Sequence, residues 1–277
     1  MINILTDSCC DLSPELIGKY KIDIIRLPVF INDRTYLDGL DINQALLFEL
    51  VGKTGQLPKT SAPSIAEFTK FFDRLGGSFF TGIATPLSAT CSNALVASQS
   101  FENGAIRVVD SLNLSTGIGL LALKAAEMRD QGRSLDEIEA VIRQSVPKVH
   151  TSFVIDTLEY VYKGGRCTAI ELIVGSLLKI RPILEVRSDG TLGIREKNRG
   201  TRKKALDSLL ADFHDHLNTL DTHRVFVTHT TSGEDALYLA GEIKKMVAID
   251  DLQITLAGST IASHAGPGCI GILYLTL

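Results

Sequence analysis

Short runs of apolar, often β-branched residues alternate along this chain with longer stretches whose apolar positions recur at helical spacing. The first pattern predicts strands, and the second predicts helices that bury one face. Their regular alternation predicts an α/β protein with a largely parallel sheet. Strands are expected at residues 2–6, 22–31, 79–85, 105–110, 151–155, 181–186, 224–229, 252–257 and 270–276, and helices at 45–51, 65–75, 88–98, 116–130, 135–144, 202–217 and 234–247.

The pattern changes near residue 180. The segment RPILEVRSDGTLGIREK contains two strand-like runs joined by Asp189-Gly190, which is typical of an antiparallel hairpin. A change from strand-helix alternation to a hairpin indicates a second domain with a mixed sheet. We therefore expect two α/β domains, at residues 1–150 and 151–277.

Composition and charge exclude several classes of protein. The chain has 277 residues, of which 45% are hydrophobic, and its net charge of −4 provides no global basic field for nucleic acid. No C-x-x-C pair is present, so reduced thiols are expected rather than disulfides or a zinc site. The N-terminus lacks a signal-peptide pattern, and no uncharged apolar run is long enough for a membrane span. These features predict a cytoplasmic protein. The cysteines are Cys9, Cys10, Cys91, Cys167 and Cys269.

The segment PKTSAPS, residues 58–64, places three hydroxyl side chains in a loop that two prolines stiffen. Ser64 and Glu67 have the spacing of a capping box, and they predict the start of the helix at residue 65. Thr60 and Ser61 have no part in that box. They are therefore candidates for holding a ligand.

Another hydroxyl follows the strand expected at residues 79–85. Ser88 in TPLSATCSNA has the position of a helix N-cap, and a helix N-terminus offers unpaired N–H groups that attract anions. A plain N-cap would explain Ser88 alone. Ser88 and Thr60, both near predicted helix starts, together favour a site for a carboxylate or a phosphate.

Other polar residues leave structural and functional explanations open. Asp7 and Asp11 follow the first strand, where they either face a ligand or cap the next turn. Arg166 follows a Gly-Gly turn, which either ends a helix or lets the arginine meet a phosphate or a partner's carboxylate. His264 lies in a loop before Gly-Pro-Gly, and structural and ligand-binding roles are equally supported.

The segment REKNRGTRKKAL forms a local basic patch that includes Arg199 and Arg202. A solvated helix start is the ordinary explanation, and docking of an acidic partner is the functional one. RNA is disfavoured because no aromatic residues interleave with the charges. Two carboxylates without a nearby histidine give little support for a metal, so no metal site is expected.

Taken together, these segments resemble the DegV family of bacterial fatty-acid-binding proteins across essentially the whole chain. The number of matching segments and their order along the chain make the resemblance specific, since no single segment would suffice. The matching segments are TDSCCDL, PKTSAPS, LSATCSNA, VVDSLNLSTGIGLL, DTLEYVYKGGR, LLKIRPIL, TRKKAL and HAGPGCIG.

The resemblance implies a fold, a ligand and a partner. Proteins similar to this one bind a long-chain fatty acid in a buried tunnel between two α/β domains, without another cofactor. The resemblance also implies that Thr60 and Ser88 hold the carboxylate, with His264 near the head group. Ser61 is expected beside Thr60. In one branch of the family the acid is presented to a separate fatty acid kinase subunit, which makes an acyl-phosphate for phospholipid metabolism. Arg166 and the basic segment with Arg199 and Arg202 are implied in that docking.

Two other functions use the same residues. Ser88, His264 and Asp110 could form a hydrolase triad, but PLSAT is not the G-x-S-x-G elbow. A sugar-phosphate binder could use the same anion site. We expect a lipid-binding protein rather than an enzyme, with no catalytic residue.

Overall fold

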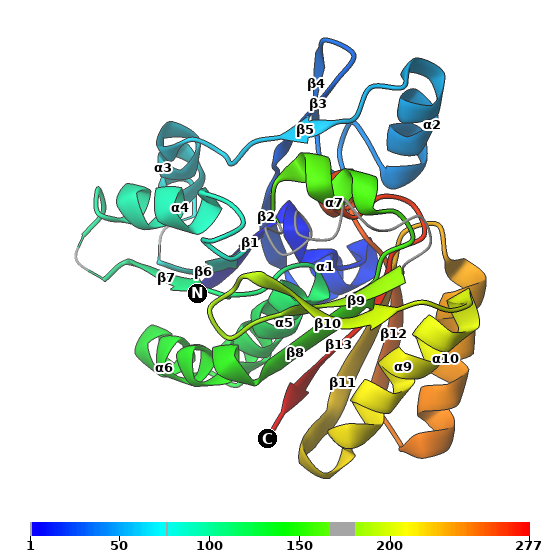
Figure 1. The fold of residues 1–277 in the computed structure, drawn as a ribbon. Coiled ribbons are helices and arrows are strands. Elements are labelled where there is room, and N and C mark those ends of the chain that lie inside the picture. Colours follow the sequence, from blue (N-terminus) through cyan, green and yellow to red (C-terminus); the bar gives the residue numbers. More distant parts are fainter. Residues whose placement is uncertain (1, 76, 103, 167–180) are drawn as a thin grey trace.

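The computed structural model describes residues 2–75, 77–102, 104–166 and 181–277, and it contains three β-sheets with helices packed around them (Figure 1). The first sheet is parallel, with the order β2-β1-β6-β7. Helices cover both of its faces, which explains why most residues of its strands are buried. Its strands are β1 (Asn3–Asp7), β2 (Ile22–Ile25), β6 (Ser78–Gly82) and β7 (Ile106–Asp110).

The second sheet has six strands in the order β10-β9-β8-β13-β11-β12, and it is mixed as expected. β11 and β12 are parallel, whereas the other neighbouring strands are antiparallel. The expected hairpin at Asp189-Gly190 is confirmed, and Gly190 has φ of +82° in its turn. The strands are β8 (Val149–Val154), β9 (Arg181–Val186), β10 (Leu192–Asn198), β11 (Leu220–His229), β12 (Asp251–Leu256) and β13 (Ile270–Thr276).

A small antiparallel sheet, with the order β4-β3-β5, corrects one prediction. The single strand expected at residues 22–31 is divided into β2 and β3 (Pro28–Ile31), which belong to different sheets. Pro28 has no N–H group to continue the first ladder, so the chain leaves that sheet there. β4 (Arg34–Leu37) and β5 (Lys59–Thr60) complete the small sheet.

The expected helices are confirmed, with ends that differ by a few residues. The predicted patterns did not include α1, α7 or α11, each of which has seven residues. The helices are α1 (Pro14–Tyr20), α2 (Gln44–Thr54), α3 (Ile65–Asp73), α4 (Thr90–Ser98), α5 (Thr116–Asp130), α6 (Leu135–Ser145), α7 (Leu158–Gly164), α9 (Arg202–Asp215), α10 (Gly233–Met246) and α11 (Ser259–Ala265). Within the described ranges, no helix is both long enough and apolar enough to cross a bilayer.

Helix α5 lies between the two large sheets (Figure 1). It packs against β1 and β6 of the first sheet and against β8, β11 and β13 of the second. One hydrophobic core therefore includes residues from both halves of the chain. The first sheet uses strands from the region before residue 111 and the second uses strands after residue 148. The division at residue 150 remains a prediction.

Candidate functional site

Two adjoining hollows bring the predicted site residues together. We call the first the polar hollow, because Thr60, Ser61, Ser88 and His264 all line it. We call its neighbour the apolar hollow, because leucine, isoleucine, valine, phenylalanine and alanine side chains line it and most of its polar side chains bond within the protein. The two hollows share the residues Leu114, Arg166, Leu192, Ile261 and His264.

Thr60 and His264 are in direct contact although 204 positions separate them in the sequence. The Thr60 hydroxyl oxygen lies 2.7 Å from His264 Nε2. Thr60 is fixed because β5 pairs with β3, where Thr60 lies opposite Val29. His264 was expected in a loop, but it lies in the last turn of α11, which ends just before Gly266 at φ of +75°. The loop prediction was wrong because Gly-Pro-Gly marks the end of a helix here.

Burial controls the charge of His264. Desolvation, reinforced by the positive charge of Arg166, lowers the pKa of His264 to about 4. The imidazole is therefore neutral near neutral pH, with one nitrogen as a donor and the other as an acceptor. Its Nδ1 atom is buried and has no hydrogen-bond partner within the described chain. A Cβ atom on Gly164 would lie 2.6 Å from that nitrogen, so the ring occupies its position only because residue 164 has no side chain.

Ser88 is not the N-cap of α4. Ala89 has that position and makes no side-chain cap. The N–H groups of Leu87 and Ser88 both donate to the carbonyl of Ala84, so a turn precedes the helix and delays its start. The Ser88 hydroxyl lies 2.8 Å from the Thr90 hydroxyl and also lines the polar hollow.

Arg166 is exposed and lines both hollows, which places it at their opening. Its Nε atom donates to the carbonyl of Leu87 at 3.4 Å, and its Nη1 atom donates to that of Gly164 at 2.5 Å. Gly165 is the left-handed C-cap of α7, with φ of +66°, so the helix-end interpretation is correct. The Gly-Gly turn and the family-like KGGR segment were the signals that this arginine could also approach a ligand.

The threonine hydroxyls of the apolar hollow have partners inside the protein. Thr228 lies 2.7 Å from the hydroxyl of Thr116, and Thr151 donates to Asn113 Oδ1 at 2.8 Å. These pairs leave mostly carbon surface to face a ligand. Each of the two hollows measures about 70 Å³, which is room for a few water-sized groups. A long ligand therefore requires side chains that line the polar and apolar hollows to move.

The acidic residues after β1 have structural partners. Asp7 accepts hydrogen bonds from the N–H groups of Cys9 and Ile83, and Asp11 accepts them from Gly258 N–H and the Ser115 hydroxyl. Burial raises the pKa of Asp7 to about 7 and raises the pKa of Asp11 well above its ordinary value. These contacts support the capping interpretation. No cluster of three or more metal-ligating side chains occurs in the described ranges.

The hydrolase triad is not assembled. The Asp110 carboxylate accepts hydrogen bonds from the N–H groups of Thr85 and Leu112. The side-chain partner of His264 is Thr60. Ser88 therefore has no base that an aspartate orients.

The basic patch is only partly available to a partner. Arg202 Nε donates to Asp235 at 2.8 Å, and its Nη2 atom donates to the Ser232 hydroxyl. Arg202 therefore joins the starts of α9 and α10, and its part in docking a partner remains a prediction. Arg199 is exposed. The cysteines Cys9, Cys10, Cys91 and Cys269 are free and buried, whereas Cys167 lies outside the described residues.

Comparison with known proteins agrees with the sequence resemblance. The model of the DegV family matches residues 1–277. The chain is 32% identical over 277 residues to a DegV domain-containing protein of Caldanaerobacter subterraneus, with coverage of 99% of this chain and 98% of the relative.

Two solved structures match the chain along its whole length. A DegV family protein of Thermus thermophilus, described as binding fatty acid, has a TM-score of 0.93 and 27% identity, covering 100% of this chain and 99% of its own. DegV of Bacillus subtilis, described as a fatty acid binding protein, has a TM-score of 0.89 and 27% identity, with the same coverage. The α/β architecture is therefore shared over the complete length of these proteins.

Proposed function

Because the chain belongs to the DegV family, we propose that it binds one long-chain fatty acid, with the carboxylate in the polar hollow and the acyl chain in the apolar hollow. The observation that carries this proposal is the contact of Thr60 with His264 at the junction of the two hollows, with Ser88 on the wall of the same polar hollow. The two fatty-acid-binding relatives with the same fold support it.

The polar hollow has the chemistry that a carboxylate head group needs. His264 is neutral, so when its proton is on Nε2 it donates to the Thr60 oxygen and leaves the Thr60 hydrogen for the ligand. Ser61 and Ser88 add hydroxyl donors, and the cation of Arg166 lies at the opening. Hydrogen bonds to a charged oxygen are stronger than neutral ones, so a few directed donors set the register of the ligand.

The acyl chain supplies most of the binding free energy. Each buried methylene is worth about 0.8 kcal/mol, so a long chain provides on the order of 10 kcal/mol before ordering costs. A sugar phosphate would leave the carbon surface of the apolar hollow unused. For this reason the lipid proposal is favoured over a sugar-phosphate binder.

Thr60→Val tests the head-group site because it keeps the side-chain shape and removes the hydroxyl. Losing a hydrogen bond to a charged group costs about 1.5–3 kcal/mol, so we expect fatty-acid affinity to fall roughly ten- to hundredfold. A fatty alcohol of equal length should bind more weakly to the wild type and lose less on substitution. Titration calorimetry with both ligands measures these differences.

The control for this experiment is Thr69→Val, at a half-buried position of α3 outside both hollows, where the hydroxyl donates to the carbonyl of Ile65. It should leave both affinities unchanged. Native mass spectrometry of the purified wild type should also reveal a bound fatty acid. The proposal fails if neither co-purified nor added fatty acid binds, or if acid and alcohol respond equally to Thr60→Val.

We further propose that the protein presents its bound acid to a fatty acid kinase subunit for acyl-phosphate formation. Arg166 supports this, because an exposed cation at the opening of the hollow can meet both the ligand and a partner. Arg199 is a second exposed cation, on the turn between β10 and α9. Arg202 is nearby, but two of its three guanidinium nitrogens already bond Asp235 and Ser232, so Arg166 and Arg199 are the main candidates for this surface.

A further inference from the structure

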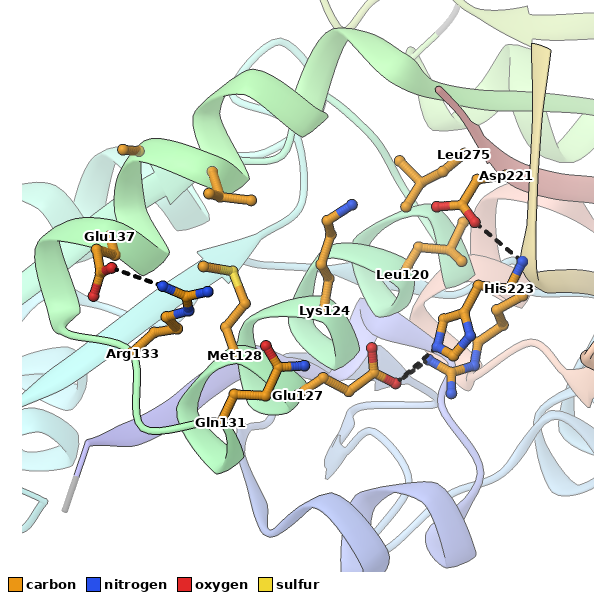
Figure 2. A pocket seen from close by; sticks show the side chains of 13 residues that line it. Leu120, Lys124, Glu127, Met128, Gln131, Arg133, Glu137, Asp221, His223 and Leu275 are labelled. Atoms are coloured by element: carbon orange, nitrogen blue, oxygen red, sulfur yellow. Dashed lines mark hydrogen bonds and ion pairs between the residues drawn. The ribbon is translucent and has the colours of Figure 1, made fainter.

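A third hollow, larger than the polar and apolar hollows, is lined in part by helix α5. We call it the rear hollow; its volume is about 570 Å³. Figure 2 shows Lys124 between the Arg133–Glu137 pair on one side and the Glu127–His223 pair on the other. Apolar side chains from three elements also line it, namely Leu120 and Met128 of α5, Val141 of α6 and Leu275 of β13.

The rear hollow and the apolar hollow lie along the same strands. On β11, Thr228 lines the apolar hollow and Arg224 lines the rear hollow. On β13, Leu273 lines the apolar hollow and Leu275 lines the rear hollow. Alternate residues of a strand face the same side of a sheet, so both hollows lie on the face that α5 covers.

A single layer of buried side chains separates the two hollows. Phe226 lies between Thr228 and Arg224 on the same face of β11, and it pairs directly with Leu273 of β13. Phe226 is two residues, or about 7 Å, from Thr228 and the same distance from Arg224, so this layer is one side chain thick. Phe226 and Leu273 are both buried in the core that α5 shares with the second sheet.

Helix α5 packs on this face of the sheet and adds a side chain to the same layer. Thr116 contacts Thr228 at 2.7 Å, and Glu127 forms an ion pair with Arg224 at 3.1 Å. These contacts align α5 with β11 at both ends of the layer. Leu120 is one helical turn after Thr116 on the same face of α5, and it is 3% exposed. Leu120, Phe226 and Leu273 therefore form the wall between the hollows.

We infer that Leu120, Phe226 and Leu273 are the chain-length stop of this protein, against which the end of the acyl chain rests. This inference depends on the proposed fatty-acid function. The apolar hollow ends at Leu273, and beyond the wall lies a space several times larger. Making the wall thinner opens that space to longer chains.

The rear hollow is suited to receive additional methylenes and to report their arrival. Leu120, Met128 and Leu275 provide apolar surface. Its cations Arg133 and Arg224 are paired with Glu137 and Glu127. Lys124 is half-buried, and within the described ranges it has neither an ion pair nor a hydrogen bond. The rate at which its amine reacts therefore reports whether an acyl chain has entered the rear hollow.

The test compares wild type with Phe226→Leu in titrations with saturated fatty acids of increasing length. In the wild type, affinity should rise about fourfold per methylene and then level off when the chain reaches the wall. In Phe226→Leu the rise should continue for several further methylenes. Leu120→Ala is a second variant that opens the same wall from the helix side.

Phe80→Leu is the matched control, because Phe80 is equally buried but packs with α3 and α4 on the other face of the first sheet. It should keep the wild-type length limit. A limit that does not move in folded Phe226→Leu and Leu120→Ala would overturn the chain-length stop. Absence of fatty-acid binding in the wild type would instead overturn the proposed function.

Acetylation of lysines with an N-hydroxysuccinimide ester, followed by peptide mass spectrometry, locates the chain end. A very long acid should slow acetylation of Lys124 at least severalfold in Phe226→Leu and leave it unchanged in the wild type. Exposed Lys53 on α2 should react equally in all samples. Equal protection of Lys124 in the wild type would show that the chain passes the wall, which contradicts the stop.

Discussion

His264 is protonated less easily in the folded protein than in the unfolded chain. Burial and the charge of Arg166 lower its pKa from 6.5 to about 4. As pH falls through this range the unfolded chain takes up the proton first, so the contribution of His264 lowers the free energy of unfolding by on the order of 3 kcal/mol. We expect His264→Gln not to show this decrease in the free energy of unfolding. Urea denaturation of both proteins at pH values above and below the range measures it.

Buried carboxylates change stability in the opposite direction. The pKa of Asp7 is raised to about 7, so its folded form holds a proton that the unfolded chain has released, and its contribution to stability decreases as pH rises. Asp7 is present in both proteins, so the comparison isolates His264. Equal acid-induced losses in wild type and His264→Gln would show that the folded histidine titrates normally.

At the scale of elements, the end of α7 positions α11. A Cβ atom on Gly164 would meet His264 Nδ1 at 2.6 Å, so Gly164→Ala should force the ring away from Thr60. A displaced rotamer costs about 0.5–1.5 kcal/mol, and we expect fatty-acid affinity to fall up to about tenfold. Gly241→Ala in α10 is the control, since its Cβ would enter open space. It should add up to about 1 kcal/mol of stability without changing affinity.

The two alanine variants separate local packing from helix propensity. Calorimetric titration gives the affinities, and urea denaturation gives the stabilities. If Gly164→Ala binds fatty acid as tightly as Gly241→Ala, the ring does not depend on the missing side chain at position 164.

At the scale of the whole molecule, the polar hollow collects residues from β5, the turn before α4, the end of α7 and α11. Kinase presentation belongs to this scale, because it needs a surface outside the hollow. Arg199→Ala should lower the rate of acyl-phosphate formation with a fatty acid kinase subunit, by about two- to fivefold for one exposed charge. The bound lipid should remain, and lower ionic strength should raise the wild-type rate.

Lys53→Ala on α2 is the control for this surface. It removes another exposed cation and should not change the rate. Loss of the bound lipid in Arg199→Ala would show that Arg199 stabilises the fold. An unchanged rate would remove Arg199 from the docking surface.

Local pattern determined most of the elements before any tertiary contact was known. The bounds of α5, β9 and β13 agree with the expected ranges, and the capping box of Ser64 and Glu67 is present. These features depend on neighbours a few residues apart, which periodicity and capping chemistry describe directly. The motifs around Thr60, Ser88 and His264 likewise indicated an anion site. That site remains a prediction until a ligand is measured.

Tertiary structure decided what depends on distant neighbours. Thr60 became a strand residue because β3 pairs with β5, and Ser88 faces the polar hollow because a turn at Ala84 delays α4. Arg202 is occupied by Asp235, which is 33 positions away, and α5 brings Leu120 to the same layer as Phe226 and Leu273. Such contacts arise only when separate elements pack, because the free energy of packing is shared among residues that no local pattern relates.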